Sequence, residues 1–157
     1  MRALIQRVTL AQVTVDGAAI GKIGRGLLLL VGIHRDDTRE DGEWLIRKIL
    51  SVRLFEDDVG KMGRSIDDVR GELLVISQFT LYGDLSKGTR PDFGAAMPVA
   101  LAKPFFEEWM KQLRFATPLN VAEGRFAAHM AVESINDGPV TLLIDSRKEA
   151  RTTPATV

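Results

Sequence analysis

The stretch LLLLVGI, residues 27–33, decides how the fold is interpreted. It is an apolar run of strand length, and polar residues do not alternate with the apolar ones. A strand with this composition is buried on both faces. The run therefore predicts a central strand in the core of a sheet. Gly24 and Gly26, which precede it, predict a turn.

The segment before this run predicts a β-hairpin. Residues 2–8 and 12–15 alternate in the manner of strands. Asp16 and Gly17 then form a pair that favours a tight turn, because both central residues of such a turn need a positive φ.

Two segments after the run predict helices, over residues 39–52 and 98–114. The first begins with acidic residues and ends with basic ones, which suits the helix dipole. The second begins at Pro98, and a first helical turn tolerates proline. The apolar side chains expected to face the core are Trp44, Leu45, Ile49 and Val52 in the first helix and Leu101, Phe105, Trp109 and Leu113 in the second.

The remaining apolar segments predict four further strands. They are RLFED at 53–57, ELLVISQFTL at 72–81, and two strands near 126–135 and 140–145 on either side of Gly138-Pro139, with a loop over 57–71. This order lacks the regular strand-helix alternation of a doubly wound parallel sheet. We expect an α+β fold with a mixed or antiparallel, barrel-like sheet and two main helices. One domain should span residues 1–145, followed by a loose polar tail over 146–157.

Composition narrows the function classes. The chain has 157 residues, enough for one domain that folds without a disulfide or metal. It has no cysteine, which excludes thiol catalysis and favours a cytoplasmic location. The longest apolar stretch is far shorter than the roughly 20 residues of a membrane-spanning helix, so no membrane span is expected.

The charge balance gives no sign of a nucleic-acid partner. Basic and acidic residues number 21 each, whereas nucleic-acid-binding domains are usually basic. A local basic face remains possible, and its candidate residues are Arg2, Arg7, Lys87 and Arg90.

The familiar catalytic motifs are missing. His34 and His129 are the only histidines, and neither lies near a suggestive nucleophile in the sequence, so a serine-type triad is not expected. Neither has a partner at metal-ligand spacing, so no metal or other cofactor is expected. Glycines 21–26 lack the Lys-Ser/Thr of a phosphate loop and are interpreted as turn residues.

Two polar segments remain as candidate sites. Ser77-Gln78-Phe79-Thr80-Leu81 ends a buried strand, where ligands often bind, although a strand running into a polar loop would look the same. Residues 136–141, NDGPVT, would equally form an ordinary hairpin loop. Local sequence alone does not separate these alternatives.

Together, SQFTL at 77–81 and NDGPVT at 136–141 resemble the two signature motifs of the D-aminoacyl-tRNA deacylase family in order and separation. Four further segments look like their family counterparts: ALIQRVTLAQVTVDG at 3–17, RLFEDDVGKM at 53–62, GTRPDF at 88–93 and GRFAAHMAV at 124–132. The resemblance covers nearly all of residues 1–145. The sequence departs from the family pattern at His129, where aspartate is common, at Gly63, and in its longer tail.

The resemblance implies a homodimer with its active site at the subunit interface. Ser77, Gln78, Phe79 and Thr80 would form the catalytic wall that receives Gly138 and Pro139, joined by a cis peptide, from the other subunit. The remaining substrate-binding positions that the resemblance implies are Arg7, Phe126, Met130, Asn136, Val140 and Thr141. Arg7 would hold the Gly-Pro element, and Phe126 and Met130 would border the pocket.

The implied activity is hydrolysis of D-aminoacyl-tRNA, and of glycine mischarged on tRNA-Ala, with rejection of L-aminoacyl-tRNA. Such an activated ester needs an oriented water or ribose 2′-hydroxyl and hydrogen-bond donors rather than a strong base. Two alternatives remain at this point. One is an esterase for small substrates with Thr80 as nucleophile, and the other is a non-catalytic tRNA-binding module.

Overall fold

The computed structural model describes residues 1–149. Eight strands follow the chain as β1 (Arg2–Val15), β2 (Ala18–Ile23), β3 (Gly26–Gly32), β4 (Phe55–Glu56), β5 (Met62–Arg64), β6 (Glu72–Ser77), β7 (Val121–Glu123) and β8 (Ala131–Asp145). The helices are α1 (Arg39–Ser51), the 3-10 helix η1 (Phe79–Tyr82), α2 (Val99–Ala116) and the short α3 (Ser146–Glu149).

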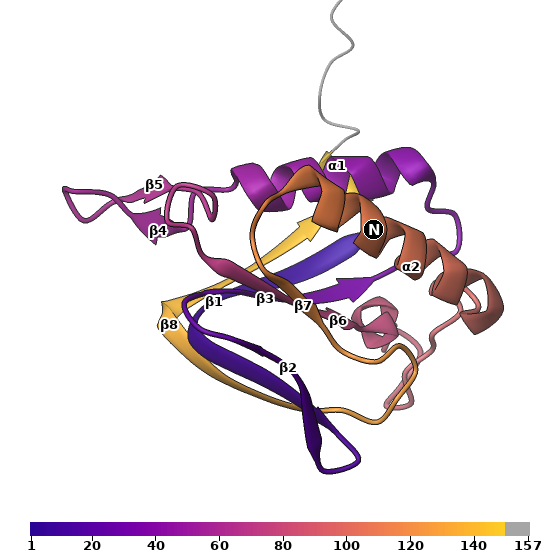
Figure 1. The fold of residues 1–157 in the computed structure, drawn as a ribbon. Coiled ribbons are helices and arrows are strands. Elements are labelled where there is room, and N and C mark those ends of the chain that lie inside the picture. The colour runs from indigo at the N-terminus through magenta and orange to yellow at the C-terminus, as the bar shows by residue number, and fades with distance from the viewer. Residues whose placement is uncertain (150–157) are drawn as a thin grey trace, which may run out of the picture.

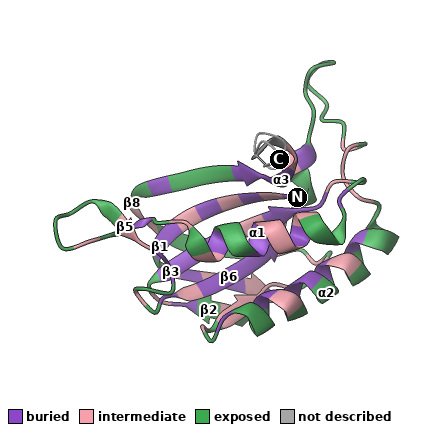
Figure 2. Cartoon of the chain, turned by 90° about the horizontal axis from the view of Figure 1, so that it is seen from above, coloured by how far each residue is buried: buried purple, intermediate pink, exposed green. Residues whose placement is uncertain are grey.

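The main sheet is mixed and nearly barrel-shaped (Figure 1). Its strand order is β2-β1-β3-β6-β7, and β8 pairs with β1. The β3–β6 and β6–β7 pairs are parallel, whereas β1 is antiparallel to β2, β3 and β8. Helices α1 and α2 lie beside each other on one face of the sheet (Figures 1 and 2). The predicted α+β fold with a barrel-like sheet and two main helices is confirmed.

The central position predicted for LLLLVGI is confirmed. β3 lies between β1 and β6 and is buried on both faces. Leu27 and Leu29 pack into the larger apolar core that the helices share, whereas Leu28 packs into a smaller core on the opposite face, with Val13 and Leu74. The run lacks alternation because both faces of this strand are packed, with only Leu30 half-buried.

The predicted first helix is confirmed and ends one residue early, at Ser51. Its start is fixed by Asp41, whose carboxylate accepts a hydrogen bond from the Thr38 N–H at 3.0 Å. Gly42 meets α2 closely, because its carbonyl accepts a hydrogen bond from the Trp109 indole at 3.0 Å.

The predicted core face of the second helix is partly wrong. Trp109 and Leu113 are buried, but Leu101 is 61% exposed. A spacing of four residues drifts around a helix that turns every 3.6 residues, so four such positions cannot share a narrow face. The buried side chains of α2 are Ala102, Phe106, Trp109, Met110 and Leu113.

The N-terminal hairpin has the predicted turn, with φ of 52° at Asp16 and 78° at Gly17.

The prediction of two separate strands near 126–135 and 140–145 is wrong. They form one strand, β8, because β1 is long enough to pair with it from Ala131 to Asp145. The register between β1 and β8 shifts around Val8, so Gly138 and Pro139 lie in an irregular part of a strand rather than in a hairpin loop.

The two ends of the described chain meet. The Met1 ammonium lies 2.8 Å from an Asp37 carboxylate oxygen, with both side chains fully buried, and donates to the Ser146 hydroxyl at 2.5 Å. That hydroxyl donates in turn to Asp41 at 2.8 Å. Of the predicted tail, Ser146 is thus part of the packed structure, while residues 150–157 lie outside the described residues. No helix within residues 1–149 is long and apolar enough to span a membrane.

Candidate active site

A cavity of about 700 Å³ opens where β6 ends. The end of β6 and the start of η1 supply one wall, and the loop over 93–98 with the first turn of α2 supplies the second. The third wall is the connection between β7 and β8, which Figure 1 shows in orange. The cavity therefore gathers three segments that lie far apart in the sequence.

The first wall contains Ser77, Gln78 and Phe79. Gln78 is fixed by its backbone, whose N–H donates to the Val31 carbonyl at 2.7 Å. Its side-chain amide donates to the Thr80 hydroxyl, which orients that amide. Phe79 is 57% exposed, and Thr80 lies outside the lining of the cavity.

The second wall is apolar and packs on the first. Phe93 meets Phe79 edge to face, with the ring centroids 5.0 Å apart. The loop is tied to the end of β3, because the Met97 N–H donates to the Ile33 carbonyl at 2.9 Å. Val99 and Ala102 extend this wall along α2.

The third wall contains Phe126, His129 and Met130. Phe126 is anchored on the core, with its ring centroid 5.6 Å from that of Phe106. Ala127 has a φ of 59°, an unusual backbone conformation for a residue with a side chain, and such residues concentrate at functional sites.

The polar side chains that line the cavity are Ser77, Gln78 and His129. His129 is its one titratable lining side chain among the described residues. Apolar walls with a few polar groups are typical of ligand sites. This arrangement can bind an organic group and orient a polar bond or a water molecule by hydrogen bonds.

The segment from Asn136 to Thr141 forms a second polar cluster, held by its own side chains. The Asn136 amide oxygen accepts from the Val140 N–H at 2.8 Å, and its amide nitrogen donates to the Thr141 hydroxyl at 3.0 Å. The peptide bond between Gly138 and Pro139 is cis, and both residues are exposed.

Arg7 anchors this second cluster from β1. Its side chain is buried, donates to the Asp137 carbonyl at 3.1 Å and to the Leu54 carbonyl at 2.6 Å, and forms an ion pair with the Asp137 carboxylate at 3.1 Å. The backbone that carries the exposed Gly138-Pro139 pair is therefore held in place by a hydrogen bond and an ion pair from the buried Arg7 side chain.

The structure thus brings the candidate residues together in two groups. Ser77, Gln78, Phe79, Phe126 and Met130 line the cavity, and Thr80 contacts the lining residue Gln78 without lining the cavity itself. Arg7, Asn136, Gly138, Pro139, Val140 and Thr141 belong to the second group and do not line the cavity of the same chain.

Sequence reasoning missed the second wall and His129 as cavity residues. The signal for the wall was present, because GTRPDF at 88–93 leads directly into it.

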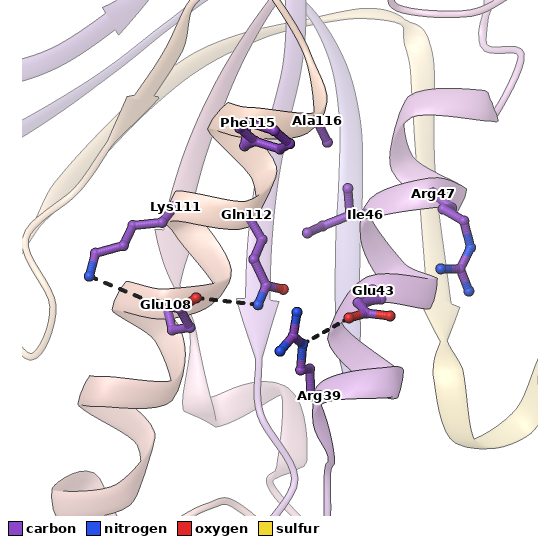
Figure 3. Close-up of a pocket in the computed structure, with 9 residues that line it drawn as sticks. All are labelled: Arg39, Glu43, Ile46, Arg47, Glu108, Lys111, Gln112, Phe115 and Ala116. Atoms are coloured by element: carbon purple, nitrogen blue, oxygen red, sulfur yellow. Dashed lines mark hydrogen bonds and ion pairs between the residues drawn. The ribbon is translucent and has the colours of Figure 1, made fainter.

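A separate hollow lies between α1 and α2 (Figure 3). Arg39 and Glu43 form an ion pair along one side, and Phe115, which is 94% exposed, lies at the far end. The charged side chains of this hollow mostly pair within their own helix, and none of the candidate site residues lines it.

Comparison with known proteins gives a family match over most of the chain. The family model described as D-Tyr-tRNA(Tyr) deacylase matches residues 4–145. A protein named D-aminoacyl-tRNA deacylase from Chloroherpeton thalassium is 52% identical over 93% of this chain and 96% of its own length. A protein of the same name from Desulfitobacterium hafniense, strain DCB-2, is 53% identical over 94% of this chain and 99% of its own length.

Two solved structures are also similar. One, named c-Myc DNA Unwinding Element Binding Protein, has a TM-score of 0.88 and 44% identity, covering 92% of this chain and 98% of its own. The other, described as a probable eukaryotic D-amino acid tRNA deacylase, has a TM-score of 0.79 and 16% identity, covering 91% of this chain and 97% of its own. At that identity, the second likeness shows the fold alone.

Proposed function

Because this chain belongs to the D-Tyr-tRNA(Tyr) deacylase family and is therefore a hydrolase of the D-aminoacyl-tRNA ester bond, we propose that the cavity at the end of β6 is where that ester is cleaved. The observation that carries the proposal is the placement of Ser77 and Gln78. These two residues belong to the SQFTL segment at 77–81, and they supply two of the three polar side chains in an otherwise apolar cavity. The proposed reaction occurs in the cytoplasm, where tRNA is charged.

The proposed mechanism uses orientation rather than a strong base. The ester that links an amino acid to tRNA is already activated, so positioning of water or of the ribose 2′-hydroxyl supplies much of the rate. Hydrogen-bond donors of the first wall, from Ser77 and Gln78, stabilise the developing oxyanion. Thr80 holds the Gln78 amide in place and forms no covalent intermediate.

We also propose that the active enzyme is a homodimer in which Gly138-Pro139 of one subunit enters the cavity of the other. Within one chain the second cluster does not reach the cavity. Four apolar side chains of β8 are more than one third exposed: Val132, Ile135, Leu142 and Leu143. Val132 also lines the cavity, so this apolar surface continues into the site. Exposed apolar side chains along a strand next to a ligand site are what a protein interface would cover.

The proposed basis of chirality is exclusion by the backbone. Carbonyl groups of the Gly138-Pro139 element would bind the α-ammonium of the substrate and leave no space for an L side chain. A D side chain points away from that wall, and glycine has no side chain to exclude. A steric wall of this kind rejects the wrong substrate without needing extra affinity for the right one.

The first prediction tests this selectivity. The wild type should hydrolyse D-tyrosyl-tRNA and glycyl-tRNA-Ala and leave L-tyrosyl-tRNA essentially intact, because the filter is a backbone wall. The measurement is the deacylation rate on matched D and L pairs. Similar rates on the D- and L-aminoacyl-tRNAs would show that the chain is a general esterase and would contradict the proposed role of the Gly138-Pro139 backbone in selectivity.

The second prediction concerns Thr80. Thr80→Val removes the hydroxyl that contacts the Gln78 amide, so the rate should fall by about what one hydrogen bond contributes, about tenfold or less, rather than to the background. No acylated Thr80 should form during turnover. Single-turnover rates and mass spectrometry of a quenched reaction give both results. An acyl group on Thr80 would instead support the small-substrate esterase that the sequence leaves open.

A further inference from the structure

The loop over 84–92, which leads into the second wall of the cavity, carries two exposed cations. Asp84 and Asp92 close the base of this loop, with reciprocal N–H to carbonyl hydrogen bonds of 2.8 Å each. Phe93, the next residue, lines the cavity and packs on Phe79. Lys87 and Arg90 lie between the two aspartates, both exposed.

The carboxylates of this loop stay charged and accept hydrogen bonds from the loop itself rather than forming ion pairs with its cations. Asp84 accepts from the Ser86 N–H at 2.8 Å and from the Ser86 hydroxyl at 2.9 Å, and these bonds lower the pKa of Asp84. Asp92 accepts from the Gly94 N–H at 2.7 Å. Within residues 1–149, neither Lys87 nor Arg90 forms an ion pair.

A third cation lies on α2, one helical turn after a residue of the second wall. Lys103 follows the cavity-lining Val99 by four residues, one helical turn along the same face. It is exposed and has no ion pair in the described part of the chain either. The other basic candidates from the sequence differ. Arg7 is buried against Asp137, and Arg2 pairs with Asp145 at 2.8 Å.

A tRNA substrate needs such cations near the cavity. The chain has a net charge of zero, so its overall field does not attract a polyanion. If the ester bond is cleaved in the cavity, the phosphates next to the 3′ end must lie just outside the cavity, beside its opening. Binding of phosphates to Lys and Arg releases counterions and gives affinity that depends on salt.

We propose that Lys87, Arg90 and Lys103 form a rim that binds the phosphates of the tRNA acceptor end. This inference rests on the proposed location of the reaction in the cavity. The three residues are positioning residues for the RNA part of the substrate. They hold the tRNA while the cavity walls act on the ester.

The experiment compares two substrates of the wild type and of the triple variant Lys87→Ala/Arg90→Ala/Lys103→Ala. One is D-phenylalanyl-tRNA, and the other is the D-phenylalanyl ester of adenosine, which keeps the ester but has no phosphate. The triple variant should show a raised KM for the tRNA with little change in kcat, and unchanged cleavage of the adenosine ester. The slope of log affinity against log salt should become less steep by about one unit for each cation removed.

Two control variants make the comparison specific. Arg47→Ala/Lys61→Ala removes one Arg and one Lys from segments that do not line the cavity, and should leave the KM for tRNA unchanged. Lys87→Arg/Arg90→Lys/Lys103→Arg keeps the three charges and should restore most of the tRNA affinity. An equal loss on both substrates, or an unchanged salt slope, would overturn the rim proposal.

Failure of the proposed active site gives a different result. A wild type that cleaves neither substrate would contradict the proposed function, not the rim. Fluorescence anisotropy with an acceptor stem-loop that carries no amino acid then tests the rim without turnover. Each phosphate contact should weaken that binding about 2.6-fold to 3.5-fold between about 50 and 200 mM salt, and the triple variant should lose the part of this salt dependence that its three cations give.

Discussion

Gly138→Ala is expected to lower kcat/KM on D-tyrosyl-tRNA by about a hundredfold or more. Gly138 has a φ of 129°, which residues with a side chain rarely adopt. An added Cβ would lie 2.7 Å from the Val140 Cγ2 and 3.1 Å from the Arg7 Nη2, and both partners are buried. The Gly-Pro element must therefore shift, and a misplacement of about 1 Å at a reacting site costs about a hundredfold in rate.

The matched control is Gly60→Ala. Gly60 also has a positive φ, of 75°, but nothing lies within 4 Å of its added Cβ, and it belongs to the β4–β5 hairpin away from the cavity. Its activity should stay near that of the wild type. Light scattering should report about twice the 17.3 kDa chain mass for the wild type and both variants. A folded, dimeric Gly138→Ala enzyme with wild-type kcat/KM would contradict the proposed role of this element.

Asp37→Asn should lower the free energy of unfolding by about 3–5 kcal/mol, a large part of the stability of a domain this size. The substitution keeps the shape of the side chain and removes its charge. The Met1 ammonium, fully buried 2.8 Å from the carboxylate, would then have lost its charged partner. Asp37 also accepts a hydrogen bond from the His34 N–H at 2.6 Å, which an amide oxygen can still accept. Urea unfolding measures the difference.

Asp36→Asn is the control for this prediction. Asp36 is adjacent in sequence and contacts His34, Arg35 and Arg147, but its side chain is 61% exposed. Solvent screens such pairs, so the free energy of unfolding should change by only about 0–1 kcal/mol. Equal losses in the two variants would show that burial of the Met1–Asp37 pair is not what stabilises this end of the molecule.

The elements that sequence predicted well are those with a local cause. The central strand followed from the unbroken run at 27–33, and the first turn followed from Asp16-Gly17. Both signals act over a few residues. The core face of α2 was predicted only in part, because the packing partner of a helix decides which of several apolar stripes is buried. Leu101, which was predicted to face the core, is exposed, and its neighbour Ala102 is buried.

The candidate site divides in the same way. Ser77 and Gln78 stood out because polar groups end a buried strand. Phe93, Met97 and His129 did not stand out, because their position around the cavity depends on how distant segments pack together. The single strand β8 was also missed. Gly and Pro usually break strands, and only the length of its partner β1 shows why this one continues.

The pairing of β1 with β8 joins Arg2 to Asp145, nearly the full length of the described chain. During synthesis at about 5–20 residues per second, the first strand leaves the ribosome many seconds before its partner is made. The N-terminal hairpin and β3 can associate early, but one edge of β1 remains open until translation reaches β8. Folding of this domain must therefore finish after β8 has cleared the exit tunnel, and that open edge is what a chaperone bound to the nascent chain would have to shield.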